Sequence, residues 1–337
     1  MFQHRSAILA FAILCLAVPA QAAPPAYTVV KEVPIGAPDK WDFVYFDTSS
    51  KRVYVSHGTE VTVVDGVTGT LIGRIPGFDT SHGVVTVPAL GRGYADSGNT
   101  RTVIVFDLKT LKPVATLPAG EDSDAMAYDA ATGRVFVMDA DGAAFTAIDA
   151  KTDKTLATRP LGGKPESAVS DGAGTVFINL ASTNELVRLD ASTLAITKRW
   201  PLSGCDSPHG LAMDTQTRRL FVSCRNDVLL VVSADDGAVV ASLPIGHGTD
   251  TVAFDHNHKL AFSSNGDGTL SVIAEQGAGT FAALGNVSTR LGARTMAVDP
   301  DSGRIFLVAG DYQPGALGVR RSLVPGSLRL LFLDRSE

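Results

Sequence analysis

Seven ionisable side chains recur along this chain at nearly one distance from an aromatic residue. Asp42 lies twelve residues before Tyr54 and five others repeat this spacing, whereas Glu166 lies eleven residues before Phe177. Carboxylates and imidazoles that converge on one point can bind a divalent cation or a cationic ligand. The regular spacing predicts one equivalent position in seven repeated units, so we expect these side chains to face a common central opening. They are Asp42, His82, Asp124, Glu166, His209, Asp250 and Arg294.

Four acids, two histidines and one arginine would give this ring a net negative charge. The seven side chains cannot all reach one ion, but the neighbours Asp42 and His82, or His209 and Asp250, could. A divalent cation is therefore a possible cofactor. The alternative is a water-filled channel mouth that tolerates charge, with Arg294 paired to a neighbouring acid, because charged networks are also common without a function.

Loops between the second and third strands of each unit should lie on the same face as the ring. The regular spacing also breaks at an insertion over residues 310–327. Such an insertion on a rigid scaffold can carry binding specificity, or it can be a variable loop without a role. The residues of these loops that could contact a ligand are Arg225, Asn265 and Asp267 and, in the insertion, Arg320 and Arg321.

The elements that position these residues repeat about every 42 residues. Each unit has a short apolar strand, a turn rich in Asp, Gly or Ser, and a second strand with a central aromatic residue, which is typical of a β-hairpin. A proline ends the outer strand in six of the units, where a missing hydrogen-bond donor does least harm. Four strands in a repeat of this length predict a propeller blade. These prolines are Pro34, Pro76, Pro118, Pro160, Pro201 and Pro244.

The two ends of the chain predict how the ring closes. The last repeat stops at Asp334 after a third strand, and residues 27–35 match a fourth strand. Joining them completes a seventh blade and covers an exposed sheet edge. The sequence therefore predicts an all-β fold, a seven-bladed β-propeller with four antiparallel strands per blade, closed by the N-terminal strand. We expect it to be a single domain over residues 23–337.

Residues 1–22 have the pattern of a secretory signal peptide. A basic residue, Arg5, precedes an apolar run over residues 7–18, and small residues follow at the expected cleavage site. We therefore expect a periplasmic or secreted protein, and no other segment is apolar enough to span a membrane. Cleavage would leave 28 of the 29 basic residues against 35 acidic ones, a net charge of −7, which disfavours nucleic acid as a partner.

Two cysteines, Cys205 and Cys224, would remain in the mature chain. Both fall at the same end of one hairpin, so an oxidising compartment favours a disulfide between them. The alternative is a pair of free, buried thiols.

The chain resembles the exported bacterial YncE-like propellers, which are related to proteins built of YVTN repeats. The resemblance covers residues 27–334. It rests on the repeated pattern of a turn followed by a strand with a central aromatic residue, and on three sequence strings: SSNGDGTL at 263–270, ARTMA at 293–297 and PGS at 325–327. It implies the propeller fold. It implies no active site, because this family has no well-defined shared catalytic motif.

The favoured function is a binding or scaffold module, by analogy with other propellers. Its partner would be an unidentified small ligand or protein on the ring face, and we expect a monomer. The alternative is a metal-assisted lyase or lactonase at the ring, with His82 or His209 as general base. The acidic ring makes binding of single-stranded nucleic acid the least favoured function.

Overall fold

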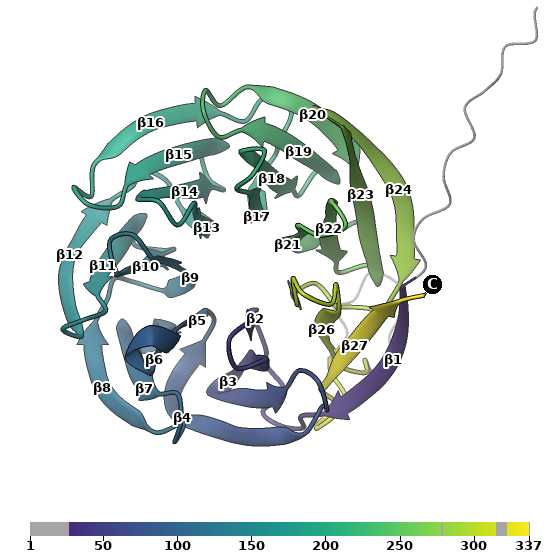
Figure 1. Ribbon diagram of the computed structural model, residues 1–337. Helices are drawn as coiled ribbons and strands as arrows, with labels where there is room; N and C mark the ends of the chain where they lie inside the picture. The colour runs from purple at the N-terminus through teal and green to yellow at the C-terminus, as the bar shows by residue number, and fades with distance from the viewer. Residues whose placement is uncertain (1–26, 278, 315–321, 337) are drawn as a thin grey trace, which may run out of the picture.

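Seven small antiparallel sheets form a closed ring in the computed structural model (Figure 1). The structure describes residues 27–277, 279–314 and 322–336. The predicted signal peptide over residues 1–22 lies outside this range, as do Arg320 and Arg321. The sequence-based prediction of a seven-bladed β-propeller with four antiparallel strands per blade is confirmed.

The chain builds each of the first six blades from the channel outward. Blade 1 contains β2 (Val44–Asp47), β3 (Arg52–Asp65) and β4 (Leu71–Ser81). Blade 2 contains β5 (Val84–Val87), β6 (Arg92–Ser97), β7 (Thr102–Asp107) and β8 (Pro113–Pro118). Blade 3 contains β9 (Ser123–Asp129), β10 (Arg134–Asp139), β11 (Ala144–Asp149) and β12 (Lys154–Pro160).

The second half of the ring repeats this plan. Blade 4 contains β13 (Pro165–Ser170), β14 (Thr175–Leu180), β15 (Glu185–Asp190) and β16 (Ile196–Pro201). Blade 5 contains β17 (Pro208–Asp214), β18 (Arg219–Cys224), β19 (Val228–Ser233) and β20 (Val239–Pro244). Blade 6 contains β21 (Thr249–Asp255), β22 (Leu260–Asn265), β23 (Thr269–Gly277) and β24 (Thr280–Ser288).

Blade 7 joins the two ends of the described chain. It contains β25 (Met296–Val298), β26 (Ile305–Ala309), β27 (Arg329–Arg335) and β1 (Tyr27–Pro34). β1 pairs antiparallel with β27 from Tyr27 opposite Arg335 to Pro34 opposite Arg329. The N-terminal strand therefore closes the ring, as the sequence predicts.

The helical content of the described residues is two short 3-10 turns, η1 (Pro88–Leu90) and η2 (Gly98–Thr100). Neither approaches the length or the apolar character that a membrane-crossing helix needs.

An aspartate at the end of the innermost strand organises the first turn in several blades. Asp47 accepts hydrogen bonds from Ser49 N at 3.0 Å and Ser50 Oγ at 2.7 Å. Asp214 and Asp255 accept the equivalent bond from the nitrogen two residues further along. Such side-chain bonds replace backbone partners and fix a tight turn. This explains why the aspartate recurs in the sequence repeat.

The aromatic residue of every second strand is buried where neighbouring blades meet. Phe221 of blade 5 stacks on Phe254 of blade 6 with ring centroids 4.9 Å apart, and Phe306 of blade 7 stacks on Phe46 of blade 1 at 5.2 Å. These contacts fix the spacing of the innermost strands around the channel. The full set is Tyr54, Tyr94, Phe136, Phe177, Phe221, Phe262 and Phe306, each with no exposed surface.

Blade 1 departs from the repeat in two ways. β3 occupies both the second and third strand positions, and its ends meet, because Gly66 N donates a 2.7 Å hydrogen bond to Lys51 O. It turns back near Gly58, whose φ of +61° suits glycine. β4 continues past Pro76, so the prediction that Pro76 ends this strand is wrong. An outermost strand tolerates the proline because one of its edges needs no donor.

Candidate functional site

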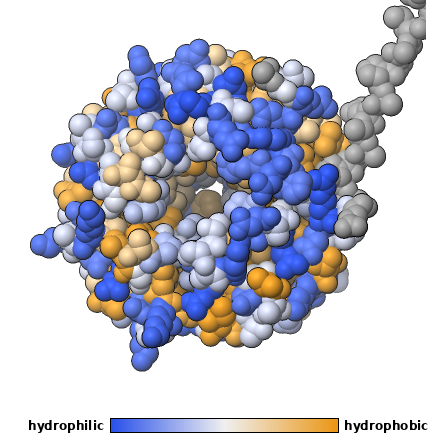
Figure 2. Space-filling view, in the orientation of Figure 1, coloured by the Kyte–Doolittle hydropathy of each residue, from blue (hydrophilic) through white to orange (hydrophobic). Residues whose placement is uncertain are grey.

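The seven predicted ring residues occupy nearly one position in their blades, and all are half-buried. In four blades the residue is the second of the innermost strand: Asp124, Glu166, His209 and Asp250. In the other three it lies two residues before that strand: Asp42, His82 and Arg294. Figure 2 shows the opening at the centre of the disc that the blades surround.

Six of the seven side chains line one cavity of about 220 Å³, called here the ring cavity. His82 is not among its lining residues. The structure adds Arg225, which the sequence places in a loop of the same face. The lining residues are Asp42, Phe43, Asp124, Glu166, Ser167, His209, Arg225, Asp250 and Arg294.

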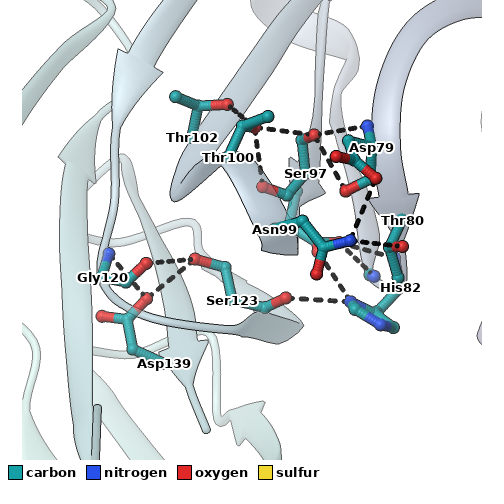
Figure 3. A network of polar contacts seen from close by, with 12 residues as sticks. Asp79, Thr80, His82, Ser97, Asn99, Thr100, Thr102, Gly120, Ser123 and Asp139 are labelled. Atoms are coloured by element: carbon teal, nitrogen blue, oxygen red, sulfur yellow. Dashed lines mark hydrogen bonds and ion pairs between the residues drawn. The ribbon is translucent and has the colours of Figure 1, made fainter. Parts of the chain in front are cut away.

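His82 is held away from the ring cavity by its own partners. Its Nδ1 lies 3.1 Å from Asp96 Oδ2. The same nitrogen lies 3.0 Å from the carbonyl oxygen of Ser123 (Figure 3). Burial alone would lower the pKa of His82, but the ion pair with the Asp96 carboxylate raises it to about 10. The imidazole is therefore charged at neutral pH. A charged imidazole has no lone pair to accept a proton, which makes His82 the less suitable of the two candidate general bases.

Asp250 forms ion pairs with two arginines. Arg294 Nε donates to Asp250 Oδ2 at 2.6 Å, and Arg225 Nη2 donates to Oδ1 at 3.3 Å. The Arg294 guanidinium also lies over the Trp41 ring, 5.7 Å from its centroid. The alternative in which Arg294 pairs with a neighbouring acid thus describes this side of the ring correctly.

His209 presents a hydrogen-bond acceptor to the ring cavity. Its Nδ1 lies 2.9 Å from the carbonyl oxygen of Ser207, which can only accept, so the proton belongs on Nδ1. Burial lowers the pKa of the His209 imidazole, so this side chain is neutral at pH 7. Its Nε2 therefore keeps a lone pair, 3.6 Å from Glu166 Oε2.

Three carboxyl groups of the ring cavity accept no hydrogen bond, and nearby positive charges compensate them only in part: His82 acts on Asp42 and Asp124, and Lys164 acts on Glu166. The side chains of Asp42, Asp124 and Glu166 make no hydrogen bond to any described residue. Burial is the main cause that raises the pKa of Asp42 and of Glu166 to about 7, and repulsion from the Asp250 carboxylate adds to it. Burial and the charge of Asp42 raise the pKa of Asp124 well above its usual range.

The candidate metal ligands have other partners. Of the two pairs that the sequence suggested, Asp42 with His82 and His209 with Asp250, His82 is bound to Asp96 and Asp250 to two arginines. In residues 27–277, 279–314 and 322–336, no three His, Cys, Asp or Glu side chains form a group that could hold a metal ion.

The predicted disulfide between Cys205 and Cys224 is confirmed, and it supports the ring cavity. Cys224 immediately precedes Arg225, whose backbone nitrogen donates to Asp206 O at 2.8 Å. The same loop contains Ser207, the hydrogen-bond partner of His209. The bridge therefore braces the segment that positions both Arg225 and His209.

The remaining loop predictions have mixed outcomes. Asn265 is fully buried and donates to Thr269 and Ser271, so it stabilises its own blade and is not presented to a ligand. Asp267 is exposed and accepts from Thr269 N at 3.0 Å and His247 N at 2.8 Å. The prediction for Arg320 and Arg321 falls outside the described residues.

The described parts of the insertion lie beside the ring. Tyr312, Ser322 and Leu323 line a second cavity of about 760 Å³, called here the rim pocket, which shares Asp42 and Arg294 with the ring cavity. These described residues of the insertion are therefore on the ring face, as the sequence predicts.

Sequence reasoning missed a layer of buried polar residues that holds the ring in place. Asp96 accepts from His82 N at 2.9 Å, Asn179 from Ser167 N at 2.7 Å, and Ser223 Oγ from Gly210 N at 3.1 Å. The signal was present in the repeat, because these residues come two positions after the second-strand aromatic. They are Asp96, Asn179, Ser223 and Ser264.

Comparisons with known proteins support the fold and nothing finer. No family model matches this chain, and no curated protein matches it. A chain of the Kuenenia stuttgartiensis hydrazine synthase aligns with a TM-score of 0.69 and 12% identity, over 79% of this chain and 91% of that one. A chain in a crystal structure of a mitotic checkpoint complex aligns with a TM-score of 0.75 and 14% identity, over 97% and 99%. The class that fold and comparisons establish is the seven-bladed β-propeller.

Proposed function

We propose that this chain is a ligand-binding module of the exported YncE-like propellers, with residues 23–337 as its mature domain. The repeated turn and aromatic strand, together with the strings at 263–270 and 293–297, support membership of this family. The pattern of residues 1–22 supports export. The disulfide between Cys205 and Cys224 also favours an oxidising compartment, the periplasm or the outside of the cell.

The ligand of this module carries an ammonium group, which binds in the ring cavity. The observation that supports this is the set of three carboxyl groups, Asp42, Asp124 and Glu166, that face one cavity and accept no hydrogen bond from a described residue. Burying a charge without compensation is unfavourable, so these groups hold protons in place of a cation. An ammonium group would replace those protons. It would donate its N–H hydrogen bonds to the ionised carboxylates.

The other groups of the ring cavity complete an acceptor site for such a cation. The neutral His209 offers the lone pair of Nε2, and Phe43 supplies an aromatic ring at the same cavity. The two arginines do not oppose the cation strongly, because Asp250 already compensates part of their charge. A volume of about 220 Å³ suits a head group with a short stem, not a large ligand.

Calorimetric titration with phenethylamine at pH 8 tests this proposal. We expect measurable binding to the wild-type protein and at least a tenfold loss of affinity in Glu166→Gln, because a charge-assisted hydrogen bond is removed. The matched control is Glu121→Gln, since Glu121 is an exposed carboxylate paired with Arg101 at 2.7 Å. Its affinity should equal that of the wild type.

Titrations with calcium, magnesium and zinc chlorides form the second arm. Binding of one of these ions with no binding of the amine would contradict the ammonium site and favour a metal centre. No binding in either arm would contradict a cation site of any kind.

A further inference from the structure

The rim pocket adjoins the ring cavity and differs from it in chemistry. Four of its lining residues are aromatic or aliphatic, and the others include Asp39, Lys40 and Ser322 as well as Asp42 and Arg294, which it shares with the ring cavity. The wall residues that matter here are Trp41, Leu291, Tyr312 and Leu323. A molecule in one cavity can therefore extend into the other past a shared carboxyl group and a shared guanidinium group.

Arg294 is fixed at this boundary with part of its guanidinium unused. Nε donates to Asp250, and one face of the group lies over Trp41, which is only 7% exposed. Among the residues that the structure describes, neither terminal nitrogen of Arg294 donates a hydrogen bond, and the side chain is 39% exposed. A guanidinium that is held in this way offers parallel N–H donors in the geometry that binds a carboxylate through both oxygens.

Gly292 allows the Tyr312 side chain to pack closely against the backbone of the rim pocket. A Cβ atom at this position would lie 2.2 Å from the Tyr312 hydroxyl oxygen, and the φ of Gly292 is +80°. Only glycine accommodates both the backbone conformation and this contact. Tyr312 thereby lies against the floor of the rim pocket, where its ring and the side chains of Leu291 and Leu323 can contact an apolar group.

We propose that the ring cavity and the rim pocket are two halves of one site for an amino-acid-like zwitterion. The ammonium group lies among the ring carboxyl groups, the carboxylate binds the terminal nitrogens of Arg294, and an apolar side chain occupies the rim pocket. This inference rests on the proposed function, which supplies the ammonium half. The carboxylate half rests on Arg294 and Trp41 alone.

Three compounds with the same aromatic body separate the two halves: phenylalanine, phenethylamine and 3-phenylpropanoate, titrated calorimetrically at pH 8. We expect phenylalanine to bind about 10- to 100-fold more tightly than phenethylamine, the gain of a charge-assisted pair of hydrogen bonds. We expect no measurable binding of 3-phenylpropanoate, which lacks the ammonium group.

Arg294→Lys tests the residue that carries the carboxylate half. Lysine keeps a positive charge beside Asp250 but lacks the planar fork, so the advantage of phenylalanine over phenethylamine should disappear. Arg225→Lys is the matched control, because Arg225 also pairs with Asp250 but does not line the rim pocket. It should shift both affinities equally and leave their ratio unchanged. Thermal denaturation of both variants checks that each remains folded.

The outcomes separate this inference from the proposed function. Equal affinity for phenylalanine and phenethylamine, or a ratio that survives Arg294→Lys, overturns the carboxylate half and leaves the ammonium site intact. Binding of 3-phenylpropanoate as tightly as phenylalanine overturns the ammonium half. If none of the three compounds binds, both proposals fail.

Discussion

Glu166→Gln should stabilise the ligand-free protein at pH 8 while it weakens ligand binding. Burial is the main reason why the pKa of Glu166 rises to about 7 from its ordinary value of 4.5. The folded protein therefore prefers the protonated carboxyl group, whereas the unfolded chain ionises it. The free energy of unfolding falls as pH rises from about 4.5 to about 7 and is lowest above that range. Glutamine has the shape of the protonated group and does not ionise.

The magnitude follows from the same pKa values. A rise from 4.5 to about 7 corresponds to about 3 kcal/mol at most at pH 8. The Glu166 side chain is 19% exposed, so solvent in the cavity screens part of this cost. We expect about 1–2 kcal/mol of stabilisation at pH 8, or a rise of a few degrees in Tm for a domain of this size, and almost none near pH 4.

Differential scanning fluorimetry of wild type and variant between pH 4 and pH 8 measures this effect. Glu121→Gln, at an exposed carboxylate, is the control and should show no comparable rise. The reasoning is refuted if Glu166→Gln lowers Tm at pH 8, or if its effect is the same at pH 4 and pH 8. Either result would mean that the Glu166 carboxylate is already compensated and that the ring cavity has no place for a cation.

Four further results are expected. The affinity for phenethylamine should rise about 10- to 100-fold from pH 6 to pH 8, as one or two carboxyl groups with pKa values near 7 ionise, and a flat profile would contradict this. The double variant of Cys205 and Cys224 to alanine should lose about 2–4 kcal/mol of stability in guanidinium denaturation. Alkylation that labels both thiols of the unreduced wild-type protein would contradict the bridge. Phe221→Ala should lose about 3–5 kcal/mol, and a loss under 1 kcal/mol would contradict its role between blades. Deletion of residues 27–34 should give aggregated protein by light scattering, whereas an unchanged Tm would contradict closure by β1.

Most of the fold could be predicted because each blade repeats the same turn and strand residues at the same spacing. The aspartate that caps a turn and the aromatic residue that fills a blade interface act within one hairpin or between neighbours, so their spacing is visible in the sequence. Pro76 was misleading for the same reason. It matches the repeat, but blade 1 has an outermost strand that continues past it, and an edge strand tolerates proline.

The positions of the ring residues could be predicted, but their partners could not. The spacing places His82 in the ring, yet its charge depends on Asp96, which lies on a different strand of the same blade. Asn265 has a loop-like sequence context, but its side chain turns inward and satisfies polar groups of its own blade. Such outcomes depend on side-chain direction and burial, which a repeat pattern does not specify.

Proton release on ligand binding tests the central claim most directly. At pH 7 the carboxyl groups of Asp42 and Glu166, whose pKa values are both about 7, are each about half protonated. Calorimetry of phenethylamine binding in buffers of different ionisation enthalpy should therefore show the release of at least one proton per ligand at pH 7, and the share that comes from Asp42 and Glu166 should fall toward zero above pH 8.5. Binding at pH 7 without proton release would show that the ammonium group does not replace protons on the ring carboxyl groups, and would contradict the proposed site.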